Sequence, residues 1–397
     1  MVWRGETPAS YEPYGRLGGS AMLLPLPIPD PDPIPLPAPV GLLKLLLILT
    51  FILHILAMNL ALGGGIIAAV THWRGQRRQS ERHLRLASEL ATRLPVALAL
   101  TITLGVAPLL FVQVLYGQFF YTSSILLGYV WLSLLLILLV GYYGYYWYAF
   151  RWEKLGARPD GRASARAPWV ITGSALLLAV IPALFANNIT LMLQPGRWWE
   201  LYRTSSHWNW RDPSLLPRYL HFLLAAIAVA GLGVLLHGLG QRRRAPEYAR
   251  WVMRYAGWWF IAATVMQYGV GVWFLLSLPQ SIWALFLGRR ATATAVLLAG
   301  VLLSFVAIVF VRACFTARQP ARVAWAAIVA LAGTVSLMAV VRDIVRDAYL
   351  APHFRPQELR VAPQWGIVIF FALVLLVGLA VVAYMLWLWR RGGATRA

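Results

Sequence analysis

Three histidines lie inside long apolar stretches of the sequence, and they are the side chains most able to carry chemistry there. They are His54, His221 and His237. Polar groups are costly inside a membrane and are therefore more often functional there than in a soluble core. Imidazole is a common axial ligand of haem iron, and its alternative role is an interhelical hydrogen bond. The three positions therefore predict either haem ligation or polar contacts between helices.

Spacing separates the three histidines. His221 and His237 are 16 residues apart, which is roughly 24 Å along a helix axis, and their rings point roughly 160° apart. They cannot serve one haem. His237 adjoins the basic sequence GQRRR and can be solvated there, so it is expected to be structural. His221, near one end of its helix, and His54, near the middle of its own, are therefore the candidate ligands of haem iron.

Two further patterns could contribute to a haem site. The sequence MAVVRDIVRDAYL places Arg342 four residues before Arg346, and Asp343 four before Asp347, so each pair shares a helical face. Local ion pairs at a solvated helix end account for this pattern. Pairing of an arginine with haem propionates accounts for it equally, because a planar guanidinium can bond both carboxylate oxygens. The three glycines at 63–65 suit either close helix packing or a flat macrocycle, and packing is the commoner cause.

The elements that must position these residues are long apolar helices. The 397 residues are 60% hydrophobic and only 12% charged, about half the charged fraction of an average soluble protein. Apolar blocks longer than about 18 residues can cross the hydrocarbon core of a membrane. Nine are expected, at residues 40–72, 90–118, 124–150, 168–194, 218–240, 250–278, 291–312, 322–344 and 365–389. The sequence therefore predicts an all-α polytopic membrane helix bundle.

The distribution of positive charge predicts the orientation of the bundle. The segments after the first, third, fifth, seventh and ninth helices, together with the helix ends that adjoin them, hold 22 of the 35 lysines and arginines. Basic loops stay on the cytoplasmic side, so the N-terminus is expected outside and the C-terminus inside, in the cell inner (cytoplasmic) membrane. The expected parts are an extracytoplasmic proline-rich arm (1–39), a nine-helix transmembrane haem-binding domain (40–390) and a cytoplasmic tail (391–397).

Composition also excludes several classes of function. The net charge of +21 comes without a DNA- or RNA-binding motif, so no nucleic-acid partner is expected. Cys314 is the one cysteine, which excludes a disulfide framework and a cysteine-ligated metal or iron–sulfur site. The 14 acidic residues fall in loops, tails or helix ends. Proton pumps and proton-coupled transporters usually keep a buried carboxylate, so the sequence disfavours both.

Two segments outside the helices have a marked composition. Proline at nearly every second position from Pro25 to Pro39 favours an extended arm, which is either a stiff tail or a segment that lies on a partner subunit. The loop after the fourth helix is rich in tryptophan. We expect these side chains to anchor at the membrane interface, with a lipid-facing quinone entrance as the alternative. They are Trp198, Trp199, Trp208 and Trp210.

Several stretches, in order, resemble subunit I of the cytochrome bd quinol oxidase superfamily. They are HILAMNLALGGG, LGVAPLLFVQVLYGQFF, FANNITLMLQPG, DPSLLPRYLHFLLAA and YARWVMRYAGW. The resemblance covers about residues 45–275 and implies that His54 is an axial ligand in the high-spin haem region. It implies that His221 ligates the low-spin haem b that accepts electrons from quinol.

The sequence departs from that family at important positions. The family's seventh helix supplies a methionine to the low-spin haem, and this seventh helix has none. Met338 in the eighth helix is the expected substitute, with His353 in the next loop as the alternative. The family's glutamates for proton delivery are replaced by apolar residues or Gln113, and its long quinol-binding loop is reduced to PQSIWALFLGRR.

These departures favour one function over two others. The leading hypothesis is a haem b subunit of a respiratory electron-transfer complex that moves electrons between the quinol pool and a cytochrome c or another redox partner. The expected cofactor-binding residues are His221, His54, Met338, Arg342 and Arg346. The expected partners are other membrane or c-type cytochrome subunits, quinol and lipid. The alternatives are a terminal quinol:oxygen oxidoreductase of the cytochrome bd type and a haem-free transporter or membrane scaffold.

Overall fold

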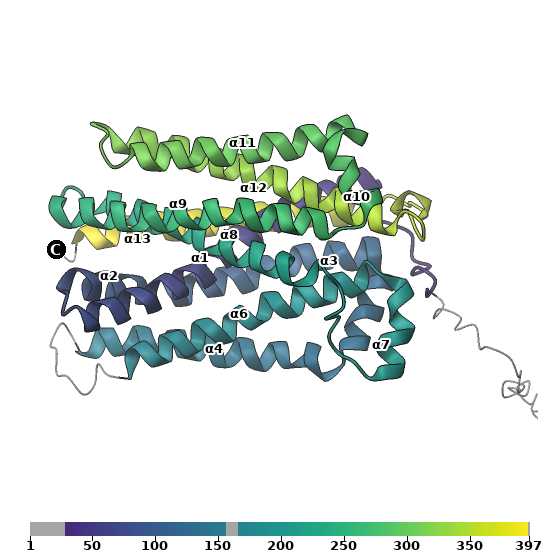
Figure 1. Cartoon of the computed structure of the whole chain (residues 1–397), viewed down its shortest axis with the longest axis horizontal. Helices are drawn as coiled ribbons and strands as arrows, with labels where there is room; N and C mark the ends of the chain where they lie inside the picture. The colour runs from purple at the N-terminus through teal and green to yellow at the C-terminus, as the bar shows by residue number, and fades with distance from the viewer. Residues whose placement is uncertain (1–27, 156–165, 396–397) are drawn as a thin grey trace, which may run out of the picture.

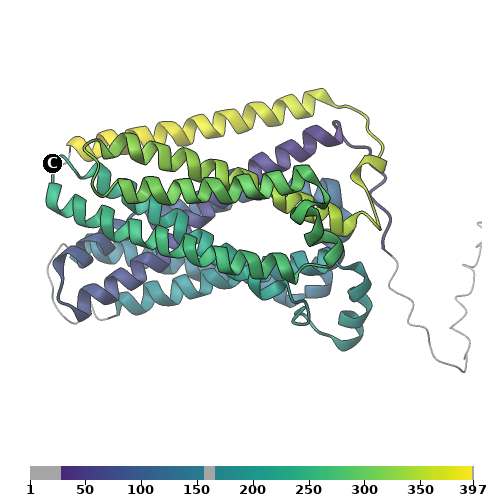
Figure 2. The ribbon, with the colours of Figure 1, turned by 45° about the horizontal axis from the view of Figure 1, so that its top comes forward.

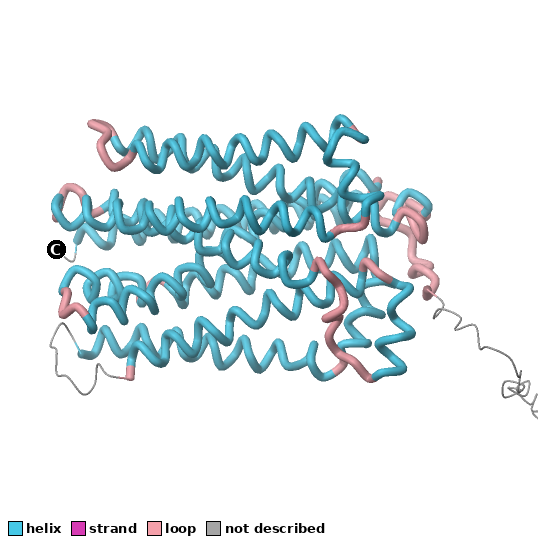
Figure 3. Tube along the Cα trace, viewed as in Figure 1, coloured by secondary structure: helices cyan, strands magenta, loops and turns pink. Residues whose placement is uncertain are grey.

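A computed structural model of the chain describes residues 28–155 and 166–395. These residues are almost entirely helical (Figures 1 and 3), with one isolated bridge between Leu36 and Val361. The long helices are α1 (Val40–Arg77), α3 (Leu94–Leu127), α4 (Tyr129–Leu155), α6 (Ala167–Met192), α8 (Leu215–Gly240), α9 (Pro246–Ser277), α11 (Ala291–Ala313), α12 (Pro320–Leu350) and α13 (Trp365–Thr395). The shorter helices are α2 (Glu81–Ala91), α7 (Trp198–Thr204) and α10 (Gln280–Ala284).

Nine helices in the described part of the chain are long and apolar enough to cross a membrane. This confirms the expected all-α polytopic architecture, although some boundaries differ. The turn between α3 and α4 falls at Gly128, where a φ of 52° favours glycine, and so lies further along the chain than expected. The segment after α1, expected as a loop, forms α2, because Leu86 and Leu90 share a helical face and are buried there. α13 extends to Thr395, into the segment expected as a tail.

The two ends of the bundle have different characters (Figures 1 and 2). One end, here called the basic end, holds the connections α1–α2, α8–α9 and α11–α12 and the end of α13. The opposite end, here called the arm end, holds residues 28–39, α7, α10 and the loop between α12 and α13. The placement of the arm end outside and the basic end in the cytoplasm stays a prediction from the loop charges.

Glycines let α1 approach its neighbours closely. A Cβ added to Gly63 would lie 2.0 Å from the carbonyl oxygen of Ala226 in α8, and one added to Gly65 would lie 1.8 Å from the hydroxyl of Tyr145 in α4. The glycine triplet at 63–65 therefore serves close helix packing, the commoner of the two explanations that its sequence allows.

Gly63→Ala is expected to destabilise the protein by about 1–3 kcal/mol, the usual cost of overpacking a core. The added methyl group would meet the backbone of Ala226, which cannot rotate away as a side chain can. Thermal unfolding of the purified protein in detergent should therefore show a lower Tm for Gly63→Ala. The matched control is Gly173→Ala, whose added Cβ meets nothing within 4 Å. Equal melting of the two variants would contradict the close packing of α1 on α8.

The described part of the proline-rich arm pairs with its own chain. The Leu36 amide donates to the Arg360 carbonyl (2.8 Å), and the Ala362 amide donates to the Leu36 carbonyl (3.0 Å). The Gln364 amide donates to the carbonyl of Pro37 (2.8 Å). This segment therefore lies on the loop between α12 and α13. Residues 1–27, which include Pro25, lie outside the described part of the chain.

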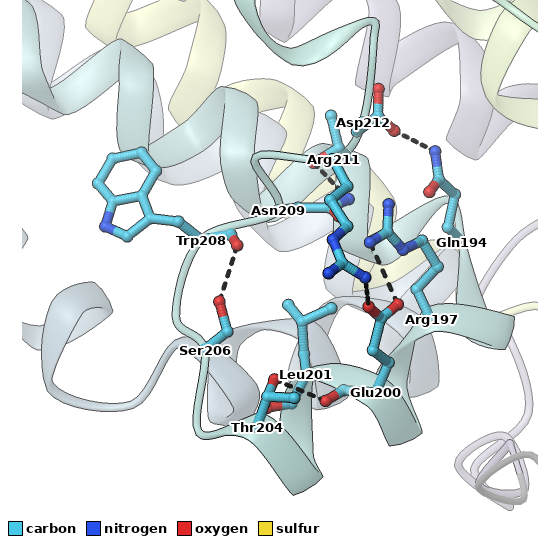
Figure 4. A network of polar contacts seen from close by, with 11 residues as sticks. Gln194, Arg197, Glu200, Leu201, Thr204, Ser206, Trp208, Asn209, Arg211 and Asp212 are labelled. Carbon is cyan, nitrogen blue, oxygen red and sulfur yellow. Dashed lines mark hydrogen bonds and ion pairs between the residues drawn. The ribbon is translucent and has the colours of Figure 1, made fainter.

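The tryptophan-rich loop is ordered by polar contacts and places the start of α8 (Figure 4). Glu200 accepts hydrogen bonds from Arg197 (3.2 Å) and Arg211 (2.6 Å). Asp212 accepts hydrogen bonds from the Gln194 side chain and from the Ser214 amide (2.6 Å). Asp212 thus ties the end of α6 to the beginning of α8, the helix that carries His221.

The tryptophans of this loop do not share one role. Trp198 is fully buried, and its indole N–H donates to the Leu191 carbonyl (2.9 Å), so its expected place at the membrane interface is corrected to the protein core. Its neighbours explain this position, because Trp198 packs near Phe119 of α3. Trp210 is 71% exposed and stacks on Trp208 at 5.0 Å, as interface anchors do.

Candidate functional site

The His221 ring lies between α8 and α9 near the arm end of the bundle. A Cβ added to Gly271 of α9 would lie 3.5 Å from His221 Cε1, and the ring centroid lies 6.3 Å from that of Phe274. Among the described residues, the buried Nδ1 of His221 has no hydrogen-bond partner. Such a buried polar atom costs about 1–3 kcal/mol unless something else satisfies it. Within the described residues, the ring therefore makes no interhelical hydrogen bond through Nδ1.

The His54 ring lies between α1 and α3. Its Nδ1 is 3.0 Å from the Thr101 carbonyl oxygen, and a Cβ added to Gly105 would lie 2.9 Å from its Cε1. A carbonyl can only accept, so Nδ1 carries the proton and donates it. The neutral ring then keeps its lone pair on Nε2, the tautomer that binds metal ions with support from a backbone carbonyl.

His237 belongs to a different environment at the basic end. Its Nε2 lies 2.6 Å from Oε2 of Glu89 in α2, and the hydroxyl of Tyr248 in α9 donates to the same oxygen at 2.9 Å. Arg85 donates to the other oxygen of Glu89 at 3.0 Å. His237 thus joins three helices through one carboxylate, in keeping with its expected structural role.

At the arm end, α1, α3 and α12 meet in a network of charges. Lys44 of α1 pairs with Asp347 and lies 3.8 Å from Asp343. The hydroxyl of Tyr116 in α3 donates to Asp347 at 2.8 Å. Arg346 pairs with Asp343, and its guanidinium lies 4.3 Å from the centre of the Tyr116 ring. The local ion-pair explanation therefore accounts for Arg346 and both aspartates.

Two other arginines near the arm end have no carboxylate partner within ion-pair distance among the described residues. Arg342 of α12 lies over the ring of Phe51, 4.4 Å from its centre, and Phe51 is about one helical turn before His54 in α1. Arg218 of α8 is 5% exposed and lies 4.8 Å from the centre of the Phe274 ring, one turn from His221. Each candidate histidine thus has a guanidinium about one turn nearer the arm end.

Neither proposed second ligand of the His221 iron lies against the His221 ring. Met338 packs on α11, where a Cβ added to Gly300 would lie 2.2 Å from the Met338 methyl carbon, whereas His221 packs on α9. His353 is exposed beyond the end of α12. Ligation by either residue stays a prediction. Within the described ranges, no group of three or more His, Cys, Asp or Glu side chains could hold a bare metal ion.

Sequence reasoning missed Lys44 and Arg218 as members of the site. Both were recognisable as cations inside apolar stretches, where a charge is expensive and needs a partner. The basic side chain of Arg218 falls one turn before His221 in the motif PRYLH. The sequence did not reveal that Lys44 pairs with carboxylates on α12. Nor did it reveal that, in the described part of the chain, no carboxylate forms an ion pair with Arg218.

Comparison with known proteins bears on the fold. No protein-family model matches the chain, and no curated protein does so either. A solved structure of bd oxidase from Geobacillus thermodenitrificans is similar, with a TM-score of 0.61 and 12% sequence identity over 90% of this chain and 100% of that one. The chain is therefore a multi-pass membrane protein with the bd oxidase fold. The resemblance found in the sequence is confirmed at the level of the fold.

Proposed function

We propose that the protein is a haem b subunit of a respiratory electron-transfer complex. The observation that carries this proposal is the pair of imidazoles inside a bundle of the bd oxidase fold. His54 has its Nδ1 proton directed at a carbonyl, which leaves Nε2 able to bind iron. His221 has a buried nitrogen without a partner. The rings lie on different helix pairs, His54 between α1 and α3 and His221 between α8 and α9, and we assign them to separate haems.

The residues around these imidazoles fit a haem. Gly105 and Gly271 present no side chain to the rings, so each imidazole lies directly against the backbone of the neighbouring helix. Arg218 and Arg342 offer guanidinium groups that can bond propionate carboxylates. A bound haem would supply a one-electron redox centre. The protein's own part is to ligate and orient that centre and to keep water away from it.

The proposed direction of electron flow follows from the position of His221. This residue lies near the arm end, and the loop charges predict that this end faces the outer side of the cytoplasmic membrane. A haem there would lie close to a surface where a c-type cytochrome or another subunit can dock. Quinol within the membrane is the proposed electron donor, and lipid covers the apolar faces.

A terminal quinol:oxygen oxidoreductase is the second candidate, because it shares the fold. Oxygen reduction consumes protons, which enter through polar or acidic side chains. In the described helices, Asp343 and Asp347 lie at the arm end and are engaged by Lys44, and Glu89 at the basic end is engaged by His237. This arrangement favours electron transfer to another protein. A haem-free transporter or scaffold is the third candidate.

The spectrum of the purified protein tests these proposals. We expect a reduced-minus-oxidised difference spectrum with the α-band of haem b, and a pyridine haemochrome of the same type. Addition of quinol should reduce this haem, and added cytochrome c should reoxidise it. Rapid quinol-driven oxygen uptake that is lost in His54→Ala would favour the oxidase. A preparation without haem would overturn the proposal and favour the transporter or scaffold.

A further inference from the structure

Arg218 is a buried cation with unused hydrogen-bonding capacity. Its side chain is 5% exposed, and its Nε has no hydrogen-bond partner in the described part of the chain. One terminal nitrogen lies 3.4 Å from the hydroxyl of Ser214, a long contact to a neutral group. The guanidinium also lies 4.8 Å from the centre of the Phe274 ring. These contacts are weak compensation for removing a full charge from water, so the guanidinium keeps the capacity to bond an anion.

The neighbouring carboxylate is not that partner. Asp212 acts on Arg218 through its charge, but its two oxygens accept hydrogen bonds from Gln194 and from the Ser214 amide. Arg342 adds to the excess of positive charge, because Arg218 and Arg346 both act on it electrostatically. Among the described residues, Arg342 itself has no carboxylate within ion-pair distance. The region therefore has two guanidinium groups available for an anion.

Arg218 and His221 converge on one place. They lie three residues apart in α8, a rise of about 4.5 Å, so Arg218 is one turn nearer the arm end. Both lie near the same Phe274 ring, the guanidinium at 4.8 Å and the imidazole at 6.3 Å from its centre. The buried nitrogens without partners, Nε of Arg218 and Nδ1 of His221, are thus close neighbours in the fold.

We propose that Arg218 holds the propionate carboxylates of the haem ligated by His221. Arg218 would hold the carboxylates about one helical turn nearer the arm end than the imidazole that would ligate the iron. Arg218 is then a positioning residue, and its positive charge favours the reduced haem. This inference rests on the proposed function, since it requires a haem at His221.

Redox titration of the full-length protein in detergent tests the proposal. Arg218→Gln removes one positive charge near the iron and is expected to lower the equilibrium constant for haem reduction about tenfold. For a one-electron couple this is a fall of about 59 mV in midpoint potential. Arg218→Lys keeps the charge and should restore most of the potential. Arg203→Gln, an exposed arginine on α7 at the same end of the bundle, is the control and should leave the potential unchanged.

Infrared redox difference spectra separate this role from a purely structural one. With haem labelled by ¹³C at the propionate carboxylates, the labelled carboxylate bands should shift in Arg218→Gln. The labelled bands should shift to a smaller extent in Arg218→Lys. If Arg218→Gln does not accumulate in the cell, the band shift in Arg218→Lys tests the same contact. Wild-type protein titrated with acetate tests a free anion as the partner, and its potential should not change.

Three results would overturn the inference. In the first, the Arg218 variants still bind haem, but their midpoint potential and their labelled infrared bands are the same as in the wild type. This result would leave the proposed function intact. In the second, acetate changes the midpoint potential of the wild-type protein, and the labelled propionate bands do not shift in the Arg218 variants. This result would show that Arg218 binds a free anion. The third is wild-type protein without haem b, which would overturn the proposed function as well.

Discussion

His221→Ala is expected to abolish the α-band of the low-spin haem b in the reduced-minus-oxidised spectrum, with a loss close to complete. Alanine has no donor atom for iron, so the variant loses the ligand that His221 would supply. The loss should appear in the pyridine haemochrome as a lower ratio of haem to protein. His54→Ala should remove a different part of the spectrum, since the two rings lie on different helix pairs.

His237→Ala is the matched control for this experiment. It removes an imidazole from the same helix, but at the basic end, where the ring bonds Glu89. We expect full haem content and a modest loss of stability, because one hydrogen bond to a charged group is worth about 1.5–3 kcal/mol. If His237→Ala lost the haem and His221→Ala kept it, the assignment of the two histidines would be wrong.

Lys44→Met is expected to destabilise the protein by about 2–3 kcal/mol, less than the usual cost of removing one partner from a fully buried ion pair, because the Asp347 side chain is 38% exposed. The Lys44 side chain is 15% exposed and serves both Asp343 and Asp347. Without it, two carboxylates of α12 stay beside the apolar face of α1. Thermal unfolding in detergent should show a large fall in Tm, and Lys44→Arg should recover part of it.

An exposed ion pair supplies the comparison for Lys44. Arg211 is 80% exposed and pairs with Glu200 at 2.6 Å. Exposed pairs contribute about 0–1 kcal/mol, so Arg211→Met should melt near the wild type. An equal fall in Tm in Lys44→Met and Arg211→Met would show that the ion pairs of Lys44 with Asp343 and Asp347 do not join α1 to α12.

The fold was largely predictable from the sequence, because a membrane helix is determined by the length and apolarity of a single segment. Each of the nine expected ranges corresponds to an observed helix. The predicted helix boundaries and side-chain positions were wrong where they depend on the conformation or the neighbours of single residues. The α3–α4 corner depends on the backbone of Gly128, and α2 depends on two leucines in a basic segment. Trp198 is buried because α3 and α6 meet around it, which no single segment reveals.

The candidate site was only partly predictable, because its members come from separate helices. His54 and His221 stand out as polar residues within apolar stretches. The pairing of Arg346 with Asp343 was one of the two explanations that their spacing allowed, and the structure contains that pair. The roles of Lys44 and Arg218 depend on neighbours from other helices, so they required the three-dimensional arrangement.

The pairing of Leu36 with the segment around Val361 has a consequence for biogenesis. The ladder joins residues near the start of the described chain to the loop that precedes α13. Its hydrogen bonds can form only after eight of the nine spanning helices have been made, and until then the arm must bond to water. The 18-residue apolar core of α13 has none of its residues buried in the bundle. The pairing therefore links the segment before α1 to the segment before α13, and it can be completed only late in the synthesis of the chain.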